Sequence, residues 1–168
     1  SIHSQSRFQN FFTPSDTLNK NRVLLASGFG LISYSGFSVG LYNAWYSKQG
    51  LGKFHAFNDI REWLHMDKAA HMFNSYFQSE LGYQGARWCG YSSGTSLIWG
   101  VSMAMLFQST IEVMDGFSYD YGFSWPDMAG NVIGIGLFTS QQLIWDEQKF
   151  RIKLSSWPKK YSKLPPNE

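Results

Sequence analysis

The chain has 168 residues, enough for one domain, and its 43% hydrophobic and 15% charged residues exclude disorder over most of its length. Its single cysteine, Cys89, excludes a disulfide scaffold and a cysteine-rich zinc site. A formal net charge of +2 argues against nucleic acid as a partner. The charges are unevenly placed, since residues 54–146 are mainly acidic and both flanking segments are mainly basic.

Four helices are predicted in chain order between two extended arms. The N-terminal arm covers 1–21, the helical domain 22–150 and a basic tail 151–168. Within the domain we expect helices at about 22–46, 60–81, 95–114 and 125–150. No βαβ alternation or internal repeat interrupts them, so the fold class is all-α, an antiparallel bundle of about four apolar helices.

Residues that begin or end helices mark these boundaries. Asp59 and Glu62 have the spacing of a capping box before the second helix, and Gly82 is predicted to end it. The sequence after Gly82, as far as residue 94, is predicted to be a loop. Ser124 is predicted to cap the fourth helix, with Pro126 in its first turn.

Three long stretches without charge indicate a membrane environment. They cover residues 23–47, 88–111 and 128–145, and about 20 apolar residues are needed to cross a bilayer. Glycines recur at four-residue spacing in "GFSVG" (36–40) and "GNVIG" (130–134), a spacing that lets helices approach closely in lipid. We therefore expect a membrane-embedded or membrane-associated bundle. A soluble domain with very buried helices is the alternative, because the mean hydropathy is only -0.26.

The residues next to these stretches suit a membrane surface. Trp and Tyr gather near their ends and basic residues lie just outside, as is typical of the membrane–water interface. The chain begins at Ser1 and not Met, so we expect an exported protein whose signal peptide has been cleaved.

Polar residues recur in helical register on three of the predicted helices. Asp67 and His71 are four residues apart, Glu112 and Asp115 three apart, and Asp127 and Asn131 four apart. Ser75 and Gln108 extend two of these faces by one turn. In a four-helix bundle the three faces can converge at one level.

This cluster is a candidate cation or acid–base site. The candidate metal ligands are His71, Glu112, Asp115 and Asp127. Oxygen donors alone would suit Ca²⁺ or Mg²⁺, whereas participation of His71 would allow Zn²⁺, Mn²⁺ or Fe²⁺. The candidate catalytic groups are His71, Glu112 and Asp127. No cofactor is certain, and a divalent cation is a possibility that the spacing leaves open.

Purely structural interpretations compete with this one. A lone histidine usually packs in a core, and Asp127 lies three residues after Ser124, at the acidic position of a capping box. Glu112 and Asp115 resist such an account because they end an apolar helix, where the helix dipole disfavours negative charge.

Two runs carry a resemblance to a known family. They are "NDIREWLHMDKAAHMFNSY" and "STIEVMDGFSYDYGFSWPDMAGNVIGIGLF", within residues 58–138. They resemble the "predicted periplasmic lipoprotein" family that includes YfiM, in its Bacteroidota form, and more distantly the VanZ-like membrane proteins. The polar positions that the resemblance implies are Asp67, Lys68, His71, Glu112, Asp115, Gly116, Ser124, Asp127 and Asn131. The family has no established activity, so the resemblance implies a place in the cell envelope and not a reaction.

Three functions remain open from the sequence. We expect a small helical protein at the outer membrane or periplasmic side of the envelope, with the inner membrane as alternative. It would be a non-enzymatic accessory subunit of a larger assembly, such as outer-membrane protein insertion or secretion machinery, with membrane lipid and other envelope proteins as partners. The alternative is a metal-dependent or acid–base hydrolase of a lipid or cell-wall substrate. The third is a membrane protein whose polar cluster only fixes helix register.

Overall fold

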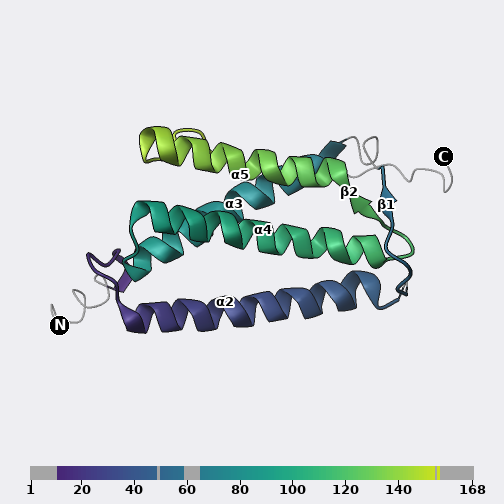
Figure 1. Cartoon of the computed structure of the whole chain (residues 1–168), viewed down its shortest axis with the longest axis horizontal. Helices are drawn as coiled ribbons and strands as arrows, with labels where there is room; N and C mark the ends of the chain where they lie inside the picture. The colour runs from purple at the N-terminus through teal and green to yellow at the C-terminus, as the bar shows by residue number, and fades with distance from the viewer. Residues whose placement is uncertain (1–10, 49, 59–64, 154, 156–168) are drawn as a thin grey trace.

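The computed structural model describes residues 11–48, 50–58, 65–153 and 155, and this part of the chain is mostly helical (Figure 1). Its long helices are α2 (Lys20–Leu41), α3 (Met66–Cys89), α4 (Ser93–Phe117) and α5 (Trp125–Trp145). A π-helical turn, η1 (Tyr42–Tyr46), continues α2. Successive helices run in opposite directions along the long axis of the molecule (Figure 1). The prediction of a mostly helical chain is confirmed.

Side-chain caps begin three of the helices. The Asn19 side chain accepts hydrogen bonds from the backbone N–H groups of Asn21 and Arg22 at the start of α2. Ser92 caps α4, and the Ser124 hydroxyl accepts from the Asp127 N–H at the start of α5. The predicted start of the fourth helix at Ser124 is therefore confirmed.

The second helix does not end at Gly82, so that prediction is wrong. Helix α3 continues to Cys89 and ends at Gly90, whose φ of 92° lies in the left-handed region that favours glycine. Gly82 serves a different purpose, because a Cβ there would lie 2.9 Å from the Cα of Gly100 in α4. The predicted loop after Gly82 thus shrinks to residues 90–92. The capping box predicted at Asp59 and Glu62 lies outside the described residues.

The fourth helix is shorter than predicted. It ends at Trp145 and not near residue 150, because Asp146 adopts a left-handed conformation with φ 55°. The chain then folds back against α3 and α5, where Gln141 and Gln148 form hydrogen bonds with each other and with the backbone of residues 137–150. These side-chain bonds are not visible in a hydrophobic pattern.

Helix α3 packs against α2, α4 and α5, and glycines allow its closest approaches. A Cβ on Gly100 would clash with the Ser79 carbonyl, and one on Gly134 with the Met72 carbonyl. The close approach predicted for the "GNVIG" run is therefore observed. Gly36 and Gly40 in the "GFSVG" run differ, since no described atom lies within 4 Å of a Cβ built on either.

Two short parallel strands lie where α4 ends and α5 begins (Figure 1). Strand β1 (Ala56–Phe57) pairs with β2 (Phe123–Ser124), Ala56 opposite Phe123 and Phe57 opposite Ser124. Two residues are too few to give an alternating pattern, so neither strand was predicted. The pair holds residues 56–57 beside the segment that begins α5.

Polarity is distributed unusually over the interior and the surface. Among the described residues, eleven buried side chains are polar or charged and eight are apolar or aromatic. No residue of α2 is buried, and its Leu24, Phe29 and Ile32 are each more than 70% exposed. By length and composition, the segments Lys20–Tyr46 and Ser93–Phe117 could each cross a membrane.

Candidate functional site

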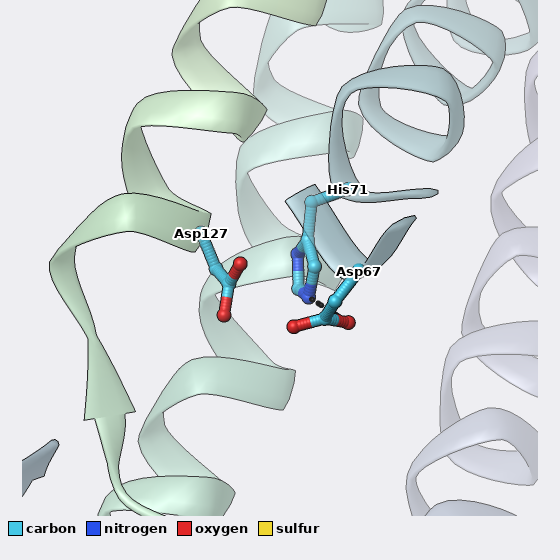
Figure 2. Close-up of side chains that lie close together, drawn as sticks. All are labelled: Asp67, His71 and Asp127. Carbon is cyan, nitrogen blue, oxygen red and sulfur yellow. Dashed lines mark ion pairs between the residues drawn. The ribbon is translucent and has the colours of Figure 1, made fainter. Parts of the chain in front are cut away.

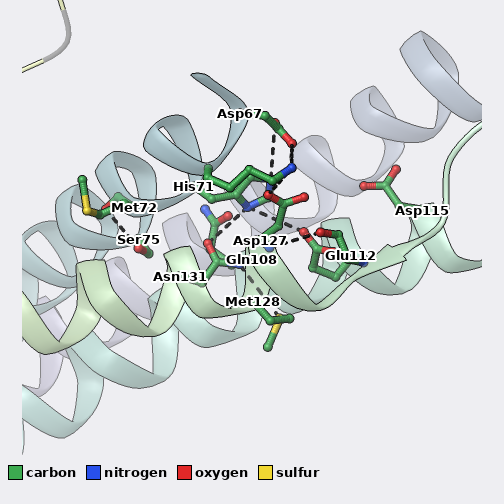
Figure 3. A network of polar contacts seen from close by, with 12 residues as sticks. Asp67, His71, Met72, Ser75, Gln108, Glu112, Asp115, Asp127, Met128 and Asn131 are labelled. Carbon is green, nitrogen blue, oxygen red and sulfur yellow. Dashed lines mark hydrogen bonds and ion pairs between the residues drawn. The ribbon is translucent and has the colours of Figure 1, made fainter. Parts of the chain in front are cut away.

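The predicted polar residues gather at the end of the molecule that carries the two strands. Asp67, Lys68 and His71 come from the first turns of α3, Glu112 from the last turns of α4, and Asp127 and Asn131 from the first turns of α5 (Figure 3). Because successive helices alternate in direction, two helix starts and one helix end meet there. We refer to these six residues as the polar centre.

The outer part of the polar centre is a lysine between two aspartates. The Lys68 ammonium nitrogen lies 3.3 Å from Asp67 Oδ2 and 3.1 Å from Asp127 Oδ1. The Asp67 side chain is 39% exposed and that of Asp127 only 5%. The centre therefore opens to the surface at Asp67 and becomes buried toward Asp127.

His71 connects the outer part to the inner part. Its Nδ1 lies 3.2 Å from Asn131 Oδ1 and 3.6 Å from Glu112 Oε1, and its Nε2 lies 3.8 Å from Asp67 Oδ1. An amide oxygen can only accept, so Nδ1 donates its hydrogen to Asn131. In the neutral ring, Nε2 then carries a free lone pair on the side of Asp67, where it can accept a proton or a metal ion.

Glu112 forms the buried end of the centre. It is 1% exposed, and its Oε2 accepts a hydrogen bond of 3.0 Å from the backbone N–H of Ser124. Ser124 in turn caps α5 through its hydroxyl, which accepts from the Asp127 N–H at 3.1 Å. The cap of α5 and the carboxylate of α4 are thus parts of one arrangement.

The structure groups the predicted metal ligands differently from the sequence. Asp67, His71 and Asp127 each offer a ligand atom, and these atoms lie within 4.8 Å of one another (Figure 2). Glu112 is not one of these three, because it lies next to the other ring nitrogen of His71, Nδ1. Asp115 does not join them, because its carboxylate accepts a hydrogen bond from the Tyr46 hydroxyl at the end of η1 (Figure 3 shows it apart from the others).

Ser75 and Gln108 were predicted to extend the polar helix faces, but their hydrogen bonds are made to residues outside the polar centre. The Ser75 hydroxyl donates to the Met72 carbonyl within α3. Gln108, one turn before Glu112, donates from Nε2 to Gln78 Oε1 at 3.0 Å.

Tyr46 and Gln78 were missed by the sequence analysis. Tyr46 is 2% exposed, and its hydroxyl donates a hydrogen bond to Asp115 from the last residue of η1. Its only signal was an aromatic residue at the end of an uncharged stretch, which also fits a membrane interface. Gln78 carried a usable signal, since it lies seven residues after His71 and so on the same face of α3.

The polar centre holds more negative than positive charge. Its carboxylates are Asp67, Glu112 and Asp127, against the one permanent cation Lys68. Even with His71 protonated, one negative charge remains, and with His71 neutral two remain. Such an excess is costly in a largely buried site, so the arrangement favours an added proton or cation.

The chain belongs to a family described as "Predicted periplasmic lipoprotein (DUF2279)", whose family model matches residues 56–141, half of the chain. The matched segment spans β1, α3, α4 and most of α5, and therefore the whole polar centre. The family description confirms the predicted location on the periplasmic side of the cell envelope. No curated protein and no solved structure shows a significant match.

Proposed function

We propose that the protein is a membrane-embedded bundle that serves as an accessory subunit of a larger assembly in the cell envelope. The observation that carries this proposal is the uncovered surface of α2. This 22-residue apolar helix has no buried residue, and only one side of it is partly covered, by contacts such as those of Tyr34 and Phe37 with Phe107 of α4. An apolar helix with so much exposed surface is stable in lipid or against another protein but not in water.

The inverted polarity supports the membrane part of the proposal. In lipid, apolar side chains on the outside cost nothing, and polar side chains gain by bonding to one another inside. Large apolar side chains are also exposed on α4 and α5. Among them are Ile98 and Leu106 on α4 and Val132, Ile133 and Ile144 on α5. Together with α2 they would form the lipid-facing surface.

Two glycines of α2 support the proposal that the protein binds a partner subunit. Gly36 and Gly40 lie one turn apart on one face, and nothing in the described chain approaches either. Elsewhere in this protein a glycine pair of the same spacing marks a helix contact, since a Cβ on Gly130 would approach the Lys68 carbonyl and one on Gly134 the Met72 carbonyl. We therefore propose that a membrane-spanning helix of a partner subunit packs on the Gly36–Gly40 face, and that lipid covers the rest of α2.

The test compares Gly36→Leu and Gly40→Leu with Gly30→Leu, which at 100° per residue lies about 100° around α2 from the middle of the Gly36–Gly40 face and also has open space around it. Complexes are extracted from membranes in a mild detergent and sized on a native gel. We expect all three variants to reach the wild-type abundance, and only the first two to lose the larger complex. A wild-type chain that migrates alone, or complexes unchanged in both variants, would contradict a partner on this face.

A second candidate, a hydrolase of a lipid or cell-wall substrate, is favoured by one observation. The hydrogen bond to Asn131 and the nearby Glu112 hold His71 with its Nε2 toward the exposed side at Asp67, as an acid–base histidine requires. Its test is release of fatty acid from radiolabelled phospholipid vesicles. Activity that is present in the wild type and lost in His71→Asn would favour the enzyme.

A further inference from the structure

We propose that Asp67, His71 and Asp127 bind one divalent transition-metal ion, with Zn²⁺ as the preferred ion. This inference does not rest on the accessory-subunit proposal, because it concerns the inside of the bundle and not its outer surface. It also differs from the ligand set predicted by sequence, since Asp67 replaces Asp115 and Glu112 acts through His71.

The geometry is close to that of a bound ion. The three ligand atoms lie within 4.8 Å of one another (Figure 2). Ligands bonded to Zn²⁺ at about 2.0–2.2 Å in a tetrahedral site are about 3.4 Å apart. Side-chain rotations that move each atom by roughly 1 Å would therefore complete the site, and the helix backbones need not move.

The donor set selects the kind of metal. One imidazole nitrogen with two carboxylate oxygens suits Zn²⁺ or Mn²⁺, whereas Ca²⁺ and Mg²⁺ prefer oxygen ligands alone. A metal-binding histidine usually donates its other ring hydrogen to an oxygen acceptor, which fixes the ring. The Nδ1 of His71 does so toward Asn131 Oδ1, with Glu112 Oε1 next to it, and this leaves Nε2 for the ion.

Lys68 marks the position that a cation takes. Its ammonium group lies between Asp67 and Asp127, about where the ion would bind both carboxylates. The Lys68 side chain is 14% exposed and lies next to the 39% exposed Asp67, so metal binding requires it to turn outward past Asp67. A divalent ion in its place neutralises more of the excess negative charge than one ammonium does. Lys68 is thus a competitor of the metal and not a ligand.

An independent observation comes from Gln108. Its side chain is 1% exposed, and its Oε1 has no hydrogen-bond partner in the described part of the chain. Figure 3 shows it directed to the side of the polar centre where His71 and Asn131 meet. A buried acceptor is costly without a donor, so the inner, Nδ1 side of the polar centre favours an added hydrogen-bond donor such as a water molecule.

The experiment titrates the purified full chain, stripped with chelator, in detergent micelles at pH 7.5. Separate calorimetric titrations use ZnCl₂, MnCl₂ and CaCl₂. The wild type is expected to bind one Zn²⁺ per chain. Asp67→Asn and His71→Asn should each weaken this binding by at least about tenfold. The exposed position of Asp67 keeps the Asp67→Asn variant folded, which circular dichroism checks.

Two further variants sharpen the result. Lys68→Gln removes the competing ammonium and is expected to tighten Zn²⁺ binding, opposite in sign to the ligand variants. Glu80→Gln is the matched control on α3, because Glu80 pairs with Arg151 and not with the polar centre. It should bind Zn²⁺ like the wild type. The proposal is overturned if the wild type binds neither Zn²⁺ nor Mn²⁺, if it binds Ca²⁺ alone, or if Asp67→Asn and His71→Asn bind like Glu80→Gln.

Discussion

Glu112 joins the three helices of the polar centre. From α4 it reaches His71 of α3 with one carboxylate oxygen and the backbone at the start of α5 with the other. At 1% exposure, this carboxylate has exchanged water for protein partners almost completely. Its replacement should therefore lower the stability of the whole protein.

Glu112→Ala is expected to destabilise the protein by about 3–5 kcal/mol, because it removes the carboxylate next to His71 and the acceptor of the Ser124 N–H hydrogen bond. Glu112→Gln keeps an acceptor for the Ser124 N–H and removes only the charge, so its cost should be nearer about 1–2 kcal/mol. Thermal unfolding in detergent, followed by circular dichroism, measures both. If both variants unfold like the wild type, Glu112 does not hold the centre together.

Cys89 offers a second test at this scale. Burial raises the pKa of its thiol, although the nearby Arg22 partly offsets this shift. A raised pKa means less thiolate at pH 7–8, and the thiol is only 2% exposed. We expect maleimide to label Cys89 slowly in the folded protein and fully in denaturant, as measured by intact mass. Rapid labelling of the folded protein would show that the end of α3 is open.

Single residues also show what the sequence could and could not predict about the site. The spacing of Asp67 and His71, and of Asp127 and Asn131, correctly placed each pair on one helix face. Asp115 shares a helix end with Glu112, yet it bonds to Tyr46. The rotation of each helix about its axis decides between these partners, and that rotation depends on packing that no local pattern reports.

At the scale of helices, the contact between α3 and α5 depends on Gly134. A Cβ there would meet the Met72 carbonyl and the Ser75 hydroxyl oxygen. The polar centre lies less than two turns away along α5, at Asp127 and Asn131. The two helices can bring these residues to His71 and Lys68 only if their backbones approach this closely.

Gly134→Ala is therefore expected to destabilise the protein by about 1–3 kcal/mol, since backbone atoms must move to admit one methyl group. The matched control is Gly136→Ala in the same helix, where nothing lies within 4 Å of the added Cβ. It should be neutral or stabilising by up to about 1 kcal/mol, because alanine favours the helix. Equal midpoints of thermal unfolding for the two variants would contradict the close contact.

Helix boundaries were predictable where a side chain sets them and not where packing does. Ser124 caps α5 as predicted, because its hydroxyl bonds within its own turn. Gly82 was mistaken for a helix end because a glycine that admits a neighbouring helix looks the same in sequence as one that ends a helix. Gly90 ends α3, and only its φ of 92° distinguishes the two roles.

At the scale of the whole molecule, polarity is inverted relative to a water-soluble domain. Among the residues that the structure describes, buried positions are more often polar than apolar, while Leu24, Phe29 and Ile32 of α2 are each more than 70% exposed. The length and composition of Lys20–Tyr46 and Ser93–Phe117 suit a membrane crossing. In the proposed embedding, lipid and a partner helix cover the apolar surface of α2 that its own chain leaves exposed.

Lipid exposure of α2 is measured most directly with a fluorescent probe in vesicles that contain nitroxide-labelled lipid. The probe is attached to a cysteine at Leu31, on the side of α2 away from the Gly36–Gly40 face, or at Asp120 in the loop before α5, in a chain whose Cys89 is replaced by alanine. Both positions are exposed, so the probe should leave the fold intact. The proposed embedding predicts blue-shifted emission and strong quenching at position 31, with water-like emission and little quenching at position 120. Water-like emission and weak quenching at both positions would contradict a membrane-embedded bundle.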